Sequence, residues 1–170
     1  MPKVLPHILA PLLLTAALGA QAVQAQEQDQ SRDTLALAAT EDQGTYLVGP
    51  DGRPVYIMIT EHGAGDDLDP LQSCEEQCRV EWPVVTIDDD ITTGEGVESD
   101  LADTVEWRGE QALTYRGQPL FYFYRDSAGE APEGQGIFSH GGHWALLAPD
   151  GTPFEDEIAP DPEQTEGEFQ

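Results

Sequence analysis

The sequence predicts an all-β fold, a small antiparallel sandwich or barrel built from two tandem hairpin repeats, with flexible acidic ends. Three observations support this prediction. Short runs of β-branched and aromatic residues recur along the chain, turns containing Gly and Pro separate them, and helical periodicity is almost absent. Because a hairpin buries its apolar face only against a second layer, we expect the hairpins to pack together.

The first 25 residues have the features of a cleavable signal peptide. Lys3 precedes an apolar run from Ile8 to Ala20, and A-x-A-like cleavage sites end at Ala22 and Ala25. The run is shorter than the roughly 20 residues that cross a bilayer. We therefore expect cleavage after Ala25, a periplasmic or secreted location, and no membrane insertion of the mature chain.

The chain carries 33 acidic against 7 basic side chains, which gives a formal net charge of −26 at pH 7. Such a field repels phosphates, so we do not expect nucleic acid as a partner, whereas a cationic protein or small ligand fits the charge. The plain interpretation of the acidity is solvation in a salty environment, where ions screen the charges. Recruitment of cations is the alternative.

After the signal peptide (1–25), composition distinguishes a repeat domain (44–154) from the segments on either side of it. The segment before the domain is polar, apart from an apolar patch at 35–39. The expected order is a flexible linker (26–43), repeat one (about 44–87), an acidic loop (88–103), repeat two (about 104–154) and an acidic disordered tail (155–170).

Two segments of the domain repeat each other. The residues from Gly52 to Glu61 align without a gap on those from Gly117 to Asp126, and in each a Gly-x-Pro turn opens an apolar run that closes on an acid. A strand-like run precedes each turn, so each copy predicts a hairpin whose return strand begins with Pro. One further strand is expected at 82–87, and a third fragment, 144–154, repeats the strand and a Pro-Asp-Gly turn without a return strand.

The motifs of the domain together resemble a known family. They are Tyr56-x-Met58-x-x-Glu61, Cys74-x-x-x-Cys78, Glu81-Trp82-Pro83 and Phe121-x-Phe123-x-x-Asp126, in that order. Over 44–154 the chain resembles the secreted repeat family of predicted bacterial lipoproteins, which is marked by tandem Tyr-x-aromatic-x-x-Asp motifs and has no known function. The resemblance implies a β-rich domain in the envelope or outside the cell, and no reaction. The chain departs from the pattern at Met58, Glu61 and Phe121, and it lacks a lipidation cysteine.

The repeated motif has two interpretations. In the first, Tyr56, Met58, Phe121 and Phe123 are core residues, and the acids at 61 and 126 cap the turns that follow through backbone N–H groups. In the second, the aromatic side chains line a groove with an acid at its mouth, which would hold a cationic or sugar-like ligand.

Cys74 and Cys78 are the only cysteines. Their spacing in an exported chain favours a local disulfide across a helical turn or a tight loop. Because the closed loop is short, we expect the bridge to pin residues 66–79 rather than to hold the fold. A redox or metal dithiol is the rival interpretation, which Glu75 and Glu76 oppose because negative neighbours raise a thiol pKa.

A metal site would use His140 and His143, which lie three residues apart on a Gly-rich segment, with His62 and Met58 as further candidates. Imidazole and thioether ligands would suit copper or another transition metal. No motif of a hydrolase or a nucleotide-binding enzyme occurs, and Ser139 is poorly placed to exchange a proton with the neighbouring His140. The sequence therefore predicts an exported, non-catalytic β-repeat module without a cofactor that binds a partner or supports the envelope. The alternative is a periplasmic metal-binding or redox accessory protein.

Overall fold

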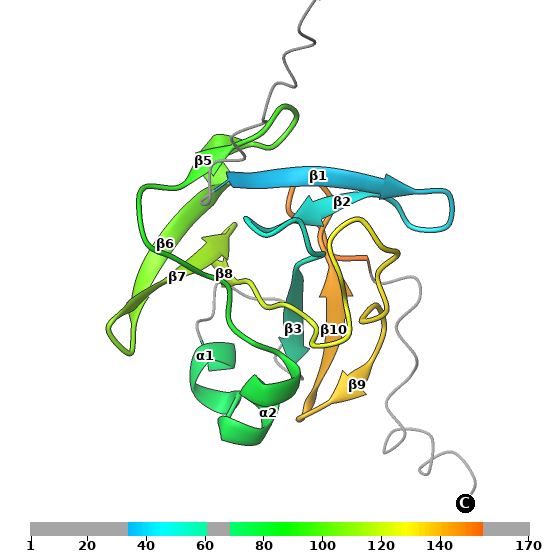
Figure 1. Ribbon diagram of the computed structural model, residues 1–170. Helices are drawn as coiled ribbons and strands as arrows, with labels where there is room; N and C mark the ends of the chain where they lie inside the picture. Colours follow the sequence, from blue (N-terminus) through cyan, green and yellow to red (C-terminus); the bar gives the residue numbers. More distant parts are fainter. Residues whose placement is uncertain (1–33, 61–68, 155–170) are drawn as a thin grey trace, which may run out of the picture.

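The computed structural model describes residues 34–60 and 69–154 (Figure 1). Within these residues the chain is mostly β, which confirms the predicted class. The strands are β1 (Thr34–Thr40), β2 (Gly44–Val48), β3 (Tyr56–Thr60), β4 (Thr86–Ile87), β5 (Thr92–Thr93), β6 (Ala102–Trp107), β7 (Glu110–Tyr115), β8 (Gln118–Pro119), β9 (Phe138–Ser139) and β10 (Gly142–Leu146). The helices are α1 (Asp69–Ser73), α2 (Glu76–Glu81) and the 3-10 turn η1 (Ser99–Leu101). No helix in the described residues is long and apolar enough to cross a membrane.

The strands form three small sheets, and none of the three closes on itself. Their strand orders are β2-β1-β5, β3-β10-β9 and β4-β7-β6, and β8 extends the last sheet by pairing with β7. The neighbours are antiparallel in every pair except β1 with β5. Isolated bridges, such as the one between Tyr56 and Phe121, join one sheet to the next.

Two-residue turns shape the hairpins. In each turn both residues have positive φ, the geometry that matches the twist of the flanking strands, and Gly takes the second position because it has no Cβ to clash. The three turns are Arg108-Gly109 between β6 and β7, Arg116-Gly117 between β7 and β8, and His140-Gly141 between β9 and β10. The last turn carries one of the histidines proposed as a metal ligand.

The two Pro-Asp-Gly turns share one geometry. The N–H of Gly49 donates to the carbonyl of Arg53 at 2.9 Å, and the N–H of Ala148 donates to the carbonyl of Thr152 at 2.8 Å. In each turn the Asp side chain accepts the N–H two residues later, at 3.0 Å in the first and 2.9 Å in the second. Equal sequences at distant positions thus fold alike because the side chain of Asp closes the turn locally.

The hairpin predicted for the first copy is only partly formed. β2 and β3 lie in different sheets and meet through the isolated pair Val48–Pro54 and one bond from the N–H of Val55 to the carbonyl of Leu47 at 3.2 Å. The return strand instead takes β10 as its partner. The second copy differs, because Pro119 at the equivalent position lies in β8 and pairs with Thr114 of β7.

The linker predicted for 26–43 is wrong where the structure describes it. Residues 34–40 form β1, which pairs with β2 over five positions, and the side chain of Leu35 is fully buried. The apolar patch noted in the sequence is therefore a core strand. The acidic loop at 88–103 also contains structure, since β5 and η1 lie within it and β6 begins at Ala102.

The central strands bury both of their faces in two apolar clusters. On β3, Tyr56 and Met58 point into the first cluster and Ile57 into the second, and on β10 Trp144 and Ala145 divide in the same way. Because side chains alternate along a strand, a strand that lies between two clusters has no polar face. This explains the nearly continuous apolar runs in the sequence.

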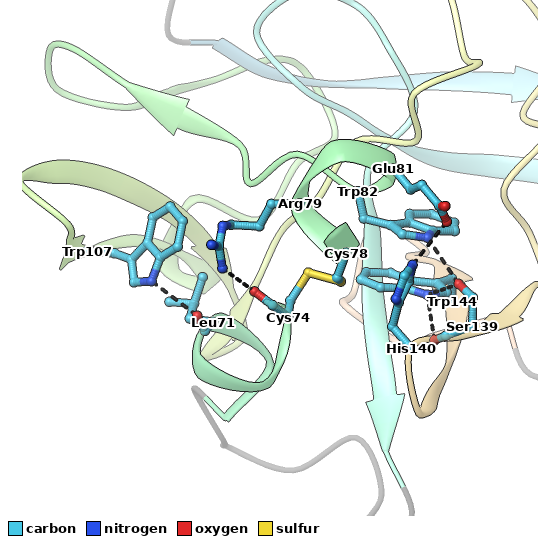
Figure 2. Close-up of a disulfide and its surroundings, with 10 residues drawn as sticks. All are labelled: Leu71, Cys74, Cys78, Arg79, Glu81, Trp82, Trp107, Ser139, His140 and Trp144. Carbon is cyan, nitrogen blue, oxygen red and sulfur yellow. Dashed lines mark hydrogen bonds and ion pairs between the residues drawn. A yellow bond between two sulfur atoms is a disulfide. The ribbon is translucent and has the colours of Figure 1, made fainter. Parts of the chain in front are cut away.

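The segment expected as a pinned loop is helical from Asp69 to Ser73 and from Glu76 to Glu81. The predicted disulfide is confirmed, because Cys74 and Cys78 are bonded with their Cα atoms 5.1 Å apart (Figure 2). Both cysteines are buried and belong to the first apolar cluster, and Arg79 donates a hydrogen bond to the carbonyl of Cys74. The bridge therefore packs the two helices against the core, in addition to closing their connection.

A Gly→Ala pair tests the packing of β10 on β3. A Cβ at Gly142 would lie 2.9 Å from the carbonyl oxygen of Ile59, whereas a Cβ at Gly94 meets nothing closer than 3.4 Å. We expect Gly142→Ala to lower the free energy of unfolding by about 1–3 kcal/mol, and Gly94→Ala to change it by less than about 0.5 kcal/mol. Urea unfolding of both variants measures the difference, and equal values would contradict the close approach of the two strands.

Candidate functional site

The residues that carry the repeated motif lie at the centre of an aromatic cluster. The indole rings of Trp82 and Trp144 stack with their centroids 4.0 Å apart and an interplanar angle of 4° (Figure 2). Tyr56 meets the ring of Trp82 edge-on at 5.5 Å, and Phe121 meets the ring of Trp144 edge-on at 5.1 Å. The two edge-on contacts are an arrangement that aromatic quadrupoles favour. Phe123 adds a third ring against Trp82, with the centroids 4.4 Å apart.

The two copies of the motif meet directly. The N–H of Tyr56 donates to the carbonyl of Phe121 at 2.8 Å, and the N–H of Phe121 donates to the carbonyl of Tyr56 at 2.9 Å. On its other side each residue bridges to a segment headed by a tryptophan, Tyr56 to Leu146 in β10 and Phe121 to Val84. The segment paired with each copy comes from the other half of the chain.

The acid of the second copy binds the tyrosine of the first. The hydroxyl of Tyr56 donates to Oδ2 of Asp126 at 2.5 Å, and the N–H of Glu133 donates to Oδ1 at 2.8 Å. The same hydroxyl accepts the N–H of Gly134 at 3.1 Å. Asp126 is 6% exposed, so both carboxylate oxygens are satisfied in a buried setting. The network ties the return of the loop 126–134 to β3.

This arrangement decides between the two interpretations of the motif. The core interpretation is confirmed for Tyr56, Met58, Phe121 and Phe123, each no more than 3% exposed. Asp126 accepts the N–H of Glu133, seven residues later, rather than an N–H of the turn that directly follows it, and its contact with Tyr56 was missed. An alignment of the copies assigns each acid to its own copy, and no local signal indicates the partner 70 residues away. Glu61 lies outside the described residues.

Burial controls the protonation of this pair. Desolvation raises the pKa of Asp126 above its ordinary value, and the hydrogen bonds from Tyr56 and Glu133 oppose the rise. Desolvation also raises the pKa of Tyr56, and the bond to Asp126 raises it further, because that bond holds the phenol proton. The hydroxyl therefore stays protonated, and the pair is suited to holding a loop rather than to transferring a proton.

The hydroxyl of Ser139 accepts hydrogen bonds from two tryptophans. Its Oγ accepts the indole N–H of Trp82 at 3.2 Å and that of Trp144 at 3.1 Å (Figure 2). Nε2 of the neighbouring His140 lies 3.0 Å from Oε2 of Glu81 instead. A serine hydroxyl that satisfies two buried donors is a structural acceptor, and this geometry does not match an activated nucleophile.

The structure places the proposed metal ligands in different surroundings. His143 packs against the ring of Phe138 with centroids 4.8 Å apart, and its Nδ1 is buried without a hydrogen-bond partner. His143 pairs with Ile59 on β3, whereas Met58 pairs with Trp144, so the imidazole and the thioether lie on opposite faces of the β3-β10 ladder. No group of three His, Cys, Asp or Glu side chains in the described residues could hold a metal ion. His62 lies outside them.

Open depressions lie on the described surface. One, of about 670 Å³, lies between the loop after β4 and the β6-β7 hairpin, and a smaller one, of about 500 Å³, lies against the loop that Asp126 anchors. The larger is lined by Asp88, Asp89, Asp90, Ile91, Asp103, Thr104 and Gln111. Its polar, acidic lining agrees with the charge of the whole chain.

Comparison with known proteins finds no matching family model, no matching curated protein and no matching solved structure.

The Tyr56–Asp126 bond gives a prediction about pH. We expect Tyr56→Phe to lower the free energy of unfolding by about 1–3 kcal/mol at neutral pH, because it removes a donor from a buried carboxylate. Loss of that donor raises the folded pKa of Asp126 further. A carboxyl with a raised folded pKa contributes stability in acid and loses it as the pH rises through that pKa. The difference in free energy of unfolding between wild type and Tyr56→Phe should therefore grow from acid to neutral pH.

Thermal or urea unfolding across this pH range checks the prediction, with Tyr115→Phe as the control. The hydroxyl of Tyr115 donates to the neutral carbonyl of Pro149 at 2.6 Å, so the deficit of the control should not change with pH. The same pH dependence in both variants would contradict a special role for Asp126.

A substitution of Ser139 tests whether the hydroxyl is structural. We expect Ser139→Ala to lower the free energy of unfolding by about 1–3 kcal/mol, because the buried indole N–H of Trp82 loses its acceptor. Ser127→Ala, at an exposed loop position, should cost less than about 0.5 kcal/mol. Unfolding curves followed by tryptophan fluorescence compare the two variants, and a stable Ser139→Ala protein would remove the structural explanation for this hydroxyl.

Proposed function

We propose that this protein is an exported, non-catalytic β-repeat module that acts by binding a cationic partner outside the cytoplasm. The observation that carries the proposal is the complete burial of the repeated motif. Its aromatic side chains and Asp126 satisfy one another in the interior, so they build the fold and leave ligand binding to the surface.

The residues that could suggest chemistry have structural partners. Ser139 accepts two indole N–H groups, and His140 pairs with the carboxylate of Glu81. Catalysis needs a nucleophile and a base within reach of each other, and a site beside them for the substrate. Neither described depression is lined by Ser139 or His140.

Export and the two-repeat organisation belong to the same proposal. The signal-like segment at 1–25 and the disulfide between Cys74 and Cys78 support an oxidising compartment outside the cytoplasm. Matching contacts in the two halves support the repeat. The edge-on contacts to Trp82 and Trp144 have interplanar angles of 80° and 79°, and Leu47 and Leu113 each donate a backbone N–H to the third residue after a tryptophan.

A native mass measurement on untagged protein from the periplasm tests this function. We expect a chain that starts near Gln26, is two hydrogens lighter because of the disulfide, and carries no metal. We also expect complexes with cationic proteins at low salt, which dissociate as the salt concentration rises. A metal or cofactor in one-to-one ratio would overturn the proposal and support the accessory role of the histidines. The absence of any salt-sensitive complex would argue against a binding module.

A further inference from the structure

We infer that the outer edge of β6 is a docking site for a basic, extended segment of a partner protein, which adds an antiparallel or parallel strand to the β4-β7-β6 sheet. The inference rests on the proposed function, because it names the surface and the chemistry by which the module binds. Its basis is an unpaired strand edge with acidic side chains along it and beside it.

The position of β6 leaves one edge of the strand open. β6 is the last strand of its sheet and pairs with β7 alone in the described part of the chain. Its end near β7's turn lies at the margin of the ribbon, and the chain that leads from β4 to β5 passes beside its beginning (Figure 1). The sequence joins β6 to β7 through the Arg108-Gly109 turn, so all of the pairing within this hairpin lies on one side of β6. Six residues in β6 match the length of an ordinary strand, enough to receive a partner.

Backbone bonds show which groups face outward. The N–H and the carbonyl of Leu113 bond to Val85 and Leu120, on the side of β7 away from β6. Successive residues alternate in direction, so Ala112 and Thr114 bond toward β6. On β6 the backbone N–H and carbonyl of Val105 and of Asp103 therefore face β7. The backbone groups of Thr104 and of Glu106 face the opposite, open side of the strand.

One of these outward groups is covered by a neighbouring side chain. Oδ1 of Asp103 accepts the N–H of Thr104 at 2.8 Å, which satisfies the donor while no strand is present. An incoming strand would replace this bond with a carbonyl, and the carboxylate of Asp103 would then be available to a lysine or arginine of the partner. Charged residues at a sheet edge also discourage indiscriminate pairing, so the edge would accept only a segment of suitable charge.

Charge complementarity identifies the occupant. Asp103 and Glu106 are exposed on β6, and the acidic depression places Asp88, Asp89 and Asp90 beside Asp103 and Thr104. A second copy of this chain would bring acids against acids at this edge, which costs free energy. A basic extended segment would satisfy the backbone groups by strand addition. Because side chains alternate along a strand, basic side chains on one of its faces would meet Asp103 and those on its other face would meet Glu106.

The test is isothermal titration of the full mature chain at low salt with a blocked peptide in which lysine alternates with threonine and valine. We expect saturable one-to-one binding. A peptide of the same sequence with N-methyl groups on consecutive backbone amides keeps the charge but has both of its hydrogen-bonding edges blocked, and it should bind about tenfold more weakly. Equal binding of the two peptides would overturn strand addition and leave only general attraction between opposite charges.

Variants of Glu106 locate the site. Glu106→Pro removes the outward N–H without disturbing the bonds to β7, since Pro is tolerated at a strand edge, and it should weaken binding of the lysine peptide about tenfold. Glu106→Gln retains the N–H, and it should weaken binding less. Glu130→Gln removes one exposed charge from the distant loop that follows Asp126, and it should leave binding unchanged.

Thermal unfolding confirms that each variant is folded before titration. If Glu106→Pro is unfolded, Thr104→Pro is used, because the N–H it removes is already bonded to Asp103 and faces outward. Equal binding by wild type and the folded proline variant would overturn the inference. If the peptides do not bind while salt-sensitive complexes persist in the native mass measurement, the proposed docking at β6 is wrong and the proposed binding function is retained.

Discussion

The stack of Trp82 on Trp144 is the interaction on which the rest of the structure depends. The two indoles come from opposite halves of the chain, and each contributes an N–H to the hydroxyl of Ser139. Tyr56 and Phe121 lie edge-on to the stack and exchange backbone hydrogen bonds with each other. Because interiors are packed closely, a shift of either ring would disturb every strand around it. The stack thus forms the centre of the first apolar cluster, to which β3 and β10 both contribute.

The repeated aromatic-acid motif is best understood as a connection between copies. Tyr56 belongs to one copy and Asp126 to the other, so the hydrogen bond between them closes the structure across the two halves. The second copy differs at this point, since Phe121 has no hydroxyl to offer an acid. A buried carboxylate with two donors also rigidifies the loop it anchors, because an unpaired charge there would be costly. The motif therefore stabilises the fold, and in the proposed function it is the acidic surface that binds the partner.

The sequence predicted the features that depend on neighbouring residues. The β class, the Pro-Asp-Gly turns, the Cys74–Cys78 bridge and the burial of the motif all follow from local pattern and spacing. Features that depend on distant partners were not predictable in this way. β1 looked like a linker because its apolar patch is short, and β2 pairs with it along the whole of its own length. Residues 56 and 126 showed no sign of their contact, and His140 and His143 are close in sequence yet engage different partners.

The exchange of strands between the halves bears on how the chain becomes a folded protein. β3 completes its ladder only with β10, and Leu47 donates its N–H to the carbonyl of Leu147, one hundred positions later. The core of the first half is therefore complete only when β10, at the end of the second half, has paired with it. Contacts between residues so far apart in the sequence form slowly. A chain with this topology cannot complete the core of its first half until its C-terminal part has been synthesised. For a protein exported as proposed above, this order of strands would favour passage through a narrow channel before folding.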